Sequence, residues 1–256
     1  MTKTSGPRCG CGRGSELPRR LFVPADRLAG STVTLDGDAH HHLSIVLRAR
    51  PGDVVTLFDG AGGEVDARVL RIDRAGTQVE LGARRSAPVS AAAITLLCAI
   101  PRGARMDLLL QKTVEVGVAT IVPLLTARAV ARPDAGRRER WVAIAREAAR
   151  QCGRADLPDI APPTPLAEAL RDDRLPARRL ALFERDEAPG LRAALAGEPA
   201  PTALLVGPEG GFEDAEREAA LAAGFTAVSL GRRILRVETA AIVAVALTAA
   251  AHGDLG

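Results

Sequence analysis

The apolar positions of the chain change their period near residue 88. Before that point, short apolar runs are separated by glycine and aspartate turns, which is typical of β-strands. One helical segment is expected at 40–48, and the closely spaced strands predict a small β-barrel over residues 19–87. The strands are expected at 21–23, 32–35, 54–58, 64–72 and 77–81.

From residue 92 onward, apolar runs of strand length alternate with longer segments of helical period. This alternation predicts an α/β domain over residues 92–252, with a mostly parallel sheet and helices on both of its faces. Strands are expected at 93–100, 120–125, 178–184, 203–207 and 227–230. Helices are expected at 105–116, 137–150, 164–172, 190–196, 213–223 and 239–251.

The last of these helices is apolar almost all round. Its side chains Ile242, Val243, Val245 and Leu247 cover every direction around the helix axis. A helix with this pattern must be buried on more than one side. A domain core and an interface between two subunits both satisfy that requirement, and the sequence leaves both open.

Composition indicates an ordinary globular protein, because 47% of the 256 residues are hydrophobic and 25% are charged. Residues 1–18 show no period and are expected to form a mobile tail. No apolar run reaches the roughly eighteen residues of a membrane span, and none resembles a signal peptide, so we expect a cytoplasmic protein without a membrane partner. The four cysteines and the adjacent histidines at 40–42 lack the spacing of ligand sets, so no metal is expected.

Positive charge gathers in one segment. The formal net charge is only +3, but residues 102–154 hold eleven lysines and arginines against five acidic residues. Arginine binds phosphates through two nitrogens of its guanidinium, which fits an RNA partner, although a coding bias toward arginine gives the same count. The chain has no tyrosine and only six other aromatic residues, five Phe and one Trp, so RNA contacts are expected through shape and phosphate rather than base stacking.

Two glycine turns predict a ligand site. The buried strand that includes 204–206 breaks at the sequence GPEGG, and the strand at 227–230 breaks at Gly231. Glycine lets the backbone approach a ligand closely, and open α/β sheets bind small molecules where strands end and helices begin. The phosphate motifs GxxxxGK[ST] and GxGxxG are missing, which argues against a nucleotide or dinucleotide site.

The sequence GPEGGF at 207–212, followed by LGxRILRxETA at 230–240, resembles the carboxy-terminal motifs of the RsmE family of ribosomal RNA uracil-N3 methyltransferases. The sequences RRLFV at 19–23 and HHLxxVLRxxxGD at 41–53 resemble the PUA-like RNA-binding domain at the amino terminus of that family. The resemblance implies a PUA-like β-barrel followed by a SPOUT α/β domain with a deep trefoil knot that holds S-adenosylmethionine. It also implies a homodimer.

The activity that this resemblance implies is methylation of N3 of a specific uridine in 16S rRNA of the small ribosomal subunit. Two alternatives stay open. One is a SPOUT methyltransferase that acts on another RNA site, such as a ribose 2′-hydroxyl, and the other is a non-catalytic RNA-binding factor. The same two turns would hold S-adenosylmethionine through backbone amides and apolar flanks, unless they are merely structural strand exits. The predicted cofactor-binding residues are Leu205, Val206, Gly207, Pro208, Glu209, Gly210, Gly211, Leu230, Gly231, Ile234, Leu235 and Arg236.

Methylation of uracil N3 requires its proton to leave and the resulting anion to be stabilised. Glu209, Glu238 and Arg236 are candidates for these catalytic roles because they lie nearest the expected pocket. Each also has a structural alternative. Glu209 would orient the turn, Glu238 would favour the dipole of the last helix, and Arg236 would pair with Glu238.

Arg154 completes the catalytic candidates. It ends the sequence QCGR at 151–154, which resembles the QCxR loop of the family near the RNA side of the pocket. A solvated surface arginine is the alternative for this position. The predicted RNA-binding residues are Arg19, Arg20, His42, Arg48, Arg128 and Arg154.

Overall fold

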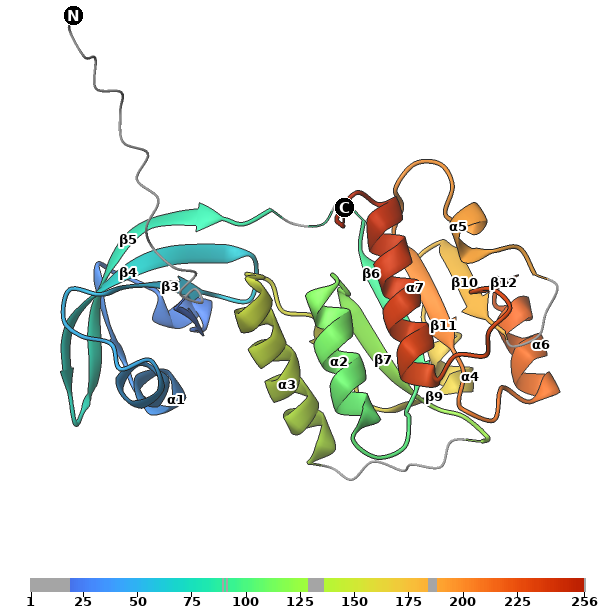
Figure 1. The fold of residues 1–256 in the computed structure, drawn as a ribbon, viewed down its shortest axis with the longest axis horizontal. Helices are drawn as coiled ribbons and strands as arrows, with labels where there is room; N and C mark the ends of the chain where they lie inside the picture. Colours follow the sequence, from blue (N-terminus) through green and yellow to red (C-terminus); the bar gives the residue numbers. More distant parts are fainter. Residues whose placement is uncertain (1–18, 89, 91, 129–135, 184–187, 256) are drawn as a thin grey trace, which may run out of the picture.

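The computed structural model describes residues 19–88, 90, 92–128, 136–183 and 188–255. The tail expected at 1–18 lies outside these residues. Figure 1 shows two bodies, an amino-terminal β-rich domain and a carboxy-terminal layered α/β domain, with the chain crossing between them after β5. No helix in the described ranges is long and apolar enough to cross a membrane.

The amino-terminal domain is built on a five-stranded sheet in the order β1-β3-β4-β5-β2. β1 pairs with β3 in parallel, and the remaining pairs are antiparallel. Leu35, Leu43, Leu57 and Val79 are fully or almost fully buried in its core. The expected strands are confirmed, whereas closure of this sheet into a barrel stays a prediction. The strands are β1 (Arg20–Phe22), β2 (Thr32–Leu35), β3 (Val54–Phe58), β4 (Gly63–Asp73) and β5 (Gly76–Ser86).

The single helix expected at 40–48 is replaced by two short segments. After the 3-10 turn η1 (Ala25–Arg27) and β2, the chain forms α1 (Gly37–His41) and then the π-helical turn η2 (His42–Val46). The Ser44 hydroxyl donates to the His40 carbonyl at 2.8 Å, and the Leu47 amide donates five residues back to the His42 carbonyl. A side chain that bonds to the preceding turn competes with the regular helical ladder, which accounts for the wider turn.

The carboxy-terminal domain contains a seven-stranded sheet in the order β12-β10-β11-β6-β7-β8, with β9 also paired to β7. All of its pairs are parallel, which confirms the expected α/β class. The helix expected at 164–172 is replaced by the short strand β9 and the short helix α4, and β8 lies where no element was expected. The strands are β6 (Ile94–Ala99), β7 (Thr120–Leu125), β8 (Asp159–Ile160), β9 (Thr164–Pro165), β10 (Arg178–Leu182), β11 (Thr202–Val206) and β12 (Thr226–Val228).

Helices cover both faces of this sheet. Along β6, Leu96 faces one apolar core and Leu97 faces the other, and both side chains are fully buried. Helices α2, α3 and α7 lie side by side over the first face (Figure 1), where α5 also packs, and α4 and α6 lie over the second. The helices are α2 (Arg105–Glu115), α3 (Arg137–Cys152), α4 (Leu166–Ala169), α5 (Leu191–Ala194), α6 (Asp214–Ala222) and α7 (Val237–Ala251).

Helix α7 has two different apolar sides. Val245 and Ala241 are fully buried in the domain core, whereas Ile242, Val243 and Ala246 are only half-buried. The core explanation therefore holds for one side of the helix. The other side leaves an apolar strip that the single chain does not cover completely.

Candidate active site

A cavity of about 660 Å³ opens where β10, β11 and β12 end. These strands are parallel and in register, so their last residues, Leu182, Val206 and Val228, meet at one edge of the sheet. The loops that follow β11 and β12 form most of the wall. The cavity is lined by Leu182, Phe183, Val206, Gly207, Pro208, Glu209, Gly210, Gly211, Phe212, Arg217, Val228, Ser229, Leu230, Gly231, Arg232, Arg233, Ile234, Leu235, Val237 and Ala240.

Two glycines shape this wall for different reasons. At Gly207 a Cβ atom would lie 2.8 Å from the Cε2 atom of Phe212, so only glycine leaves room for the ring beside the strand end. Gly231 has a φ of 103°, a left-handed conformation that side chains other than glycine rarely adopt. The Phe212 ring therefore occupies the space that a side chain at position 207 would fill, whereas a Cβ atom at Gly231 would have no neighbour within 4 Å.

Aromatic side chains form the part of the cavity wall beside Gly207. The rings of Phe183 and Phe212 meet edge to face, with centroids 5.9 Å apart and planes at 88°. The guanidinium of Arg217 lies 4.5 Å from the centroid of the Phe183 ring. Phe183 follows β10, whereas Phe212 and Arg217 both follow β11, so no pattern within one segment indicates the contacts of Phe183.

The predicted cofactor-binding residues gather around this cavity with two exceptions. Leu205 lies one residue before the strand end, and its side chain is buried in the same apolar core as Phe183 and Phe212 without lining the cavity. Arg236 is the exposed residue before the first turn of α7 and does not line the cavity. The cofactor role of the whole set stays a prediction.

The two candidate carboxylates share one arginine. Arg105, the first residue of α2, places Nη1 at 3.4 Å from Glu209 Oε1 and Nε at 3.8 Å from Glu238 Oε1. The Glu209 side chain is 31% exposed, whereas the Glu238 side chain is 8% exposed.

Burial, together with the negative charges of Glu209 and Glu238, raises the pKa of the Cys98 thiol far above its usual value. Arg105 was not among the sequence candidates, because nothing in its local sequence distinguishes it from other helix-terminal arginines.

Arg236 does not pair with Glu238, which corrects one of the alternatives considered from the sequence. In the described part of the chain, the Arg236 side chain makes no ion pair or hydrogen bond, and Glu238 pairs with Arg105 instead. The start of α7 separates the two side chains, since Arg236 precedes the helix and is exposed, whereas Glu238 lies in the first turn and is buried.

Arg154 is occupied within the chain. Its side chain is only 15% exposed, donates from Nη1 to the carbonyls of Val114 and Val118 at 2.9 and 2.8 Å, and pairs with Asp156. Burial opposes ionisation of Asp156, but the hydrogen bonds and the positive charge of Arg154 hold the pKa of this carboxyl below its usual value. The geometry gives Arg154 a structural role and does not favour the catalytic or RNA contact predicted for it.

The other predicted RNA-binding residues fall into separate places. Arg128 lies at the cavity, where Nη1 donates to the Gly210 carbonyl at 2.8 Å. Arg48 is exposed in a left-handed conformation with φ 49°, and Arg19 pairs with Asp53. Arg20 is 7% exposed, so its guanidinium lies inside the molecule rather than on an RNA-facing surface.

His42 lies half-buried at the border between the domains. Burial lowers its pKa below the usual 6.5, the positive charge of Arg150 on α3 lowers it further with a smaller contribution from His41, and Glu147 on α3 opposes this shift. The His42 ring nitrogen Nε2 is buried and has no partner among the described residues. This environment favours a neutral imidazole, which is a poor phosphate contact.

Residues 88–249 match the family model of the RNA methyltransferase domain, and residues 35–81 match that of the RNA methyltransferase PUA domain. A parallel sheet with a cavity at its strand ends, joined to a small β domain, is thus the two-domain architecture of an RNA methyltransferase. Among curated relatives, the ribosomal RNA small subunit methyltransferase E of Synechocystis is 36% identical over 233 residues, which cover 89% of this chain and 76% of the relative. The chain belongs to the ribosomal RNA small subunit methyltransferase E family.

Two solved structures resemble the whole molecule. The ribosomal RNA small subunit methyltransferase E of Neisseria gonorrhoeae, bound to S-adenosylmethionine, is 37% identical and superimposes with a TM-score of 0.82 over 90% of this chain and 95% of its own. A methyltransferase of Legionella pneumophila, also in complex with that cofactor, is 33% identical with a TM-score of 0.83 over 91% of this chain and 98% of its own.

Proposed function

We propose that this chain transfers a methyl group from S-adenosylmethionine to N3 of a specific uridine in 16S rRNA. The observation that carries the proposal is the cavity at the ends of β10, β11 and β12, whose two glycine turns belong to the segment matched by the RNA methyltransferase domain. The similar enzyme of Neisseria gonorrhoeae binds S-adenosylmethionine, and its name specifies the ribosomal RNA of the small subunit as substrate.

The cavity fits this cofactor. Its volume of about 660 Å³ is in the range of small-molecule sites. The uncrowded backbone at Gly231 offers hydrogen-bonding groups, and Leu230, Ile234 and Leu235 offer apolar surface for a purine. Bound there, S-adenosylmethionine would supply an electrophilic methyl group on a sulfonium.

The chain's contribution to the reaction is mainly alignment. Methyl transfer from a sulfonium disperses charge, so holding the nucleophile in line and excluding water accounts for much of the rate. Of the two candidate carboxylates, Glu209 lines the cavity and is partly exposed, whereas Glu238 is buried outside the lining. We therefore assign removal of the N3 proton to Glu209 and a structural role, through Arg105, to Glu238.

Unpaired arginines suit an RNA substrate. Arg232 and Arg233 line the cavity and are exposed, as is Arg236 just beyond them. Across the described residues, none of the three side chains has an ion-pair or hydrogen-bond partner. Guanidinium groups at a cavity mouth would bind the phosphates that flank a nucleotide inserted into the cavity.

The same proposal includes the knot, the dimer and the cellular location implied by the family resemblance. The half-buried strip Ile242, Val243 and Ala246 on α7 is the surface we assign to the dimer. An apolar strip that one subunit leaves half-covered is what a two-fold contact would bury. The enzyme would act in the cytoplasm, where it would meet either free 16S rRNA or the small ribosomal subunit.

The decisive experiment is mass spectrometry of nuclease-digested 16S rRNA from a strain that lacks this gene. We expect 3-methyluridine to disappear, to return with the wild-type gene, and to stay absent with Glu209→Gln. Unchanged 3-methyluridine together with a lost 2′-O-methyl nucleotide would instead identify a ribose methyltransferase. No change in any modified nucleotide, with no S-adenosylmethionine binding by calorimetry, would identify a non-catalytic RNA-binding factor.

A further inference from the structure

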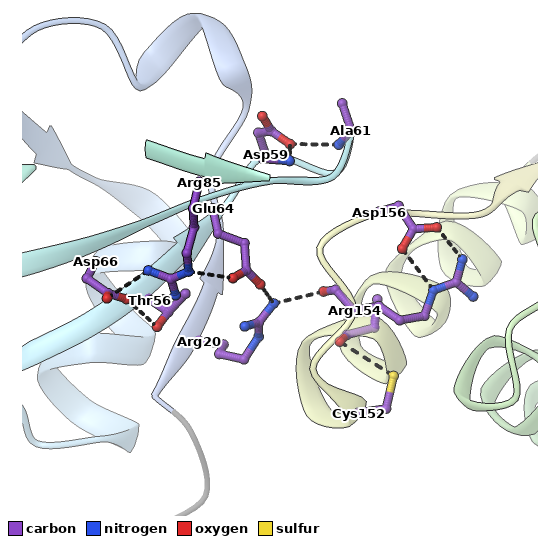
Figure 2. A network of polar contacts seen from close by, with 12 residues as sticks. Arg20, Thr56, Asp59, Ala61, Glu64, Asp66, Arg85, Cys152, Arg154 and Asp156 are labelled. Atoms are coloured by element: carbon purple, nitrogen blue, oxygen red, sulfur yellow. Dashed lines mark hydrogen bonds and ion pairs between the residues drawn. The ribbon is translucent and has the colours of Figure 1, made fainter. Parts of the chain in front are cut away.

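The border between the two domains is closed by a buried arginine. Arg20, on β1, places Nη2 at 2.5 Å from Glu64 Oε1 and at 3.1 Å from the backbone carbonyl oxygen of Arg154 (Figure 2). Its guanidinium also lies 5.3 Å from the centre of the Phe58 ring. One nitrogen of the amino-terminal domain therefore donates to groups of both domains at once.

The amino-terminal domain holds this arginine in place. Glu64 also accepts from Arg85 at 3.1 Å, and Arg85 pairs with Asp66 at 2.7 Å (Figure 2). The Glu64 side chain is only 10% exposed. A buried carboxylate with two arginine partners has little freedom to move, so it fixes the direction in which Arg20 points.

The carboxy-terminal domain holds the acceptor equally firmly. The side chain of Arg154 donates to the carbonyl of Val114 in the last turn of α2 and to that of Val118 just beyond the helix. The adjacent loop pairs with the other domain through its backbone. The Leu157 amide donates to Gly60 at 2.9 Å, and the Gly62 amide donates to Ala155 at 3.2 Å.

Helix α2 connects this border to the cavity. Its eleven residues, Arg105–Glu115, span about 16 Å at the usual rise of a helix. The border contacts meet its carboxyl end, and Arg105 at its amino end contacts Glu209 and Glu238. One rigid element thus relates the position of the amino-terminal domain to the position of the cavity wall.

We infer that Arg20 and Glu64 are positioning residues, which hold the RNA-binding domain at a fixed orientation to the cavity through the backbone of Arg154. This inference rests on the proposed function. It also replaces the RNA contact expected for Arg20 with a role inside the protein. An RNA that touches both domains would then find its two contact surfaces already aligned, and the loss of alignment would weaken RNA binding without touching the cofactor site.

The test is the double variant Arg20→Met/Glu64→Leu, which replaces the buried pair by apolar side chains of similar size and removes the link to Arg154. The matched control is Arg27→Met/Asp36→Leu, because this pair lies exposed in the same domain at 2.8 Å and its replacement leaves the net charge equally unchanged. Both variants therefore carry the same overall attraction for RNA phosphates.

We expect the KM for RNA to rise about tenfold in the Arg20→Met/Glu64→Leu variant relative to the control, while kcat at saturating RNA and the affinity for S-adenosylmethionine stay within about twofold. Small-angle X-ray scattering should show a wider distribution of interdomain distances. An unchanged KM for RNA, or an equal fall in cofactor affinity, would overturn the inference. If the double variant does not fold, Arg20→Lys takes its place, since lysine keeps the charge but is shorter and lacks the planar guanidinium that brings Nη2 between Glu64 and the Arg154 carbonyl.

The same experiment separates this inference from the proposed function. A wild-type protein that methylates no RNA would refute the proposed function, yet the scattering comparison would still show whether the Arg20–Glu64 pair fixes the domain orientation. Scattering curves that are identical for the wild type and the double variant would refute the positioning role even if the enzyme is active.

Discussion

Gly207→Ala is the substitution for which the structure gives the sharpest expectation. An added Cβ would lie 2.8, 2.9 and 3.3 Å from three atoms of the Phe212 ring, where ordinary contacts begin at 3.4 Å. The ring must therefore retreat by roughly half an ångström or the strand end must shift. The ring is 8% exposed and meets Phe183 edge to face, so it has little room to retreat.

Overpacking of this kind costs about 1 to 3 kcal/mol. If the strain falls on the cofactor-bound cavity, the affinity for S-adenosylmethionine should fall about 5-fold to 150-fold, since about 1.4 kcal/mol corresponds to a factor of ten. Titration calorimetry measures this affinity directly, and circular dichroism shows whether the variant remains folded.

Gly210→Ala is the matched control. Gly210 lines the same turn, but its added Cβ would meet only the flexible Arg128 side chain, at 3.4 Å, so cofactor affinity should stay within about twofold of wild type. Phe212→Leu, added to Gly207→Ala, should restore part of the lost affinity because it removes the atoms that collide. A folded Gly207→Ala variant that binds as tightly as the wild type would refute the assignment of this cavity to the cofactor.

Three further predictions concern stability, chemistry and assembly. The pKa of His42 is lower in the folded state than in the unfolded state, so its contribution to stability is complete above about pH 6.5 and is lost as the pH falls below that value. In urea unfolding, the free energy of unfolding should therefore fall more between about pH 7.5 and pH 5.5 for the wild type than for His42→Gln. Arg105→Met should lower kcat with little change in KM for the cofactor, because Glu209 loses the ion pair that orients it. Steady-state kinetics measures both constants, and an unchanged kcat would contradict this role of Arg105. Val243→Asp should yield folded monomers by light scattering, whereas Val245→Asp should unfold the domain because that side chain is fully buried, and a dimeric Val243→Asp would contradict the proposed interface.

The central strands β6 and β11 of the parallel sheet were predictable because they are buried on both faces and therefore form continuous apolar runs. The five apolar runs of the second domain correspond to β6, β7, β10, β11 and β12. Their spatial order was not predictable. Strand β12 pairs with β10 and strand β6 with β11, and no pattern within a single strand indicates these neighbours. The strands β8 and β9 were missed because two-residue strands leave no periodic signal.

The glycine turns around the cavity were predictable because glycine marks the strand exits. The aromatic wall was not, because Phe183 follows β10 and is far along the sequence from the turn and from Arg217. A sequence shows which residues can approach a ligand closely, since that depends on a residue's own backbone freedom. It does not show which side chains from other segments complete the cavity wall, since that depends on how separate elements pack.

Arginine roles depend on partners that only the fold supplies. The sequence assigned Arg20 and Arg154 to RNA, but both side chains bond inside the protein to a carboxylate and to carbonyl groups. Arg232 and Arg233 were left out of the RNA-binding set, yet in the described part of the chain their side chains have no such partners and line the cavity. An arginine whose donors are already bonded must break those bonds to bind phosphate, whereas an unpaired one gives up only water. The arginines best suited to receive RNA are therefore those with the fewest contacts to the protein itself.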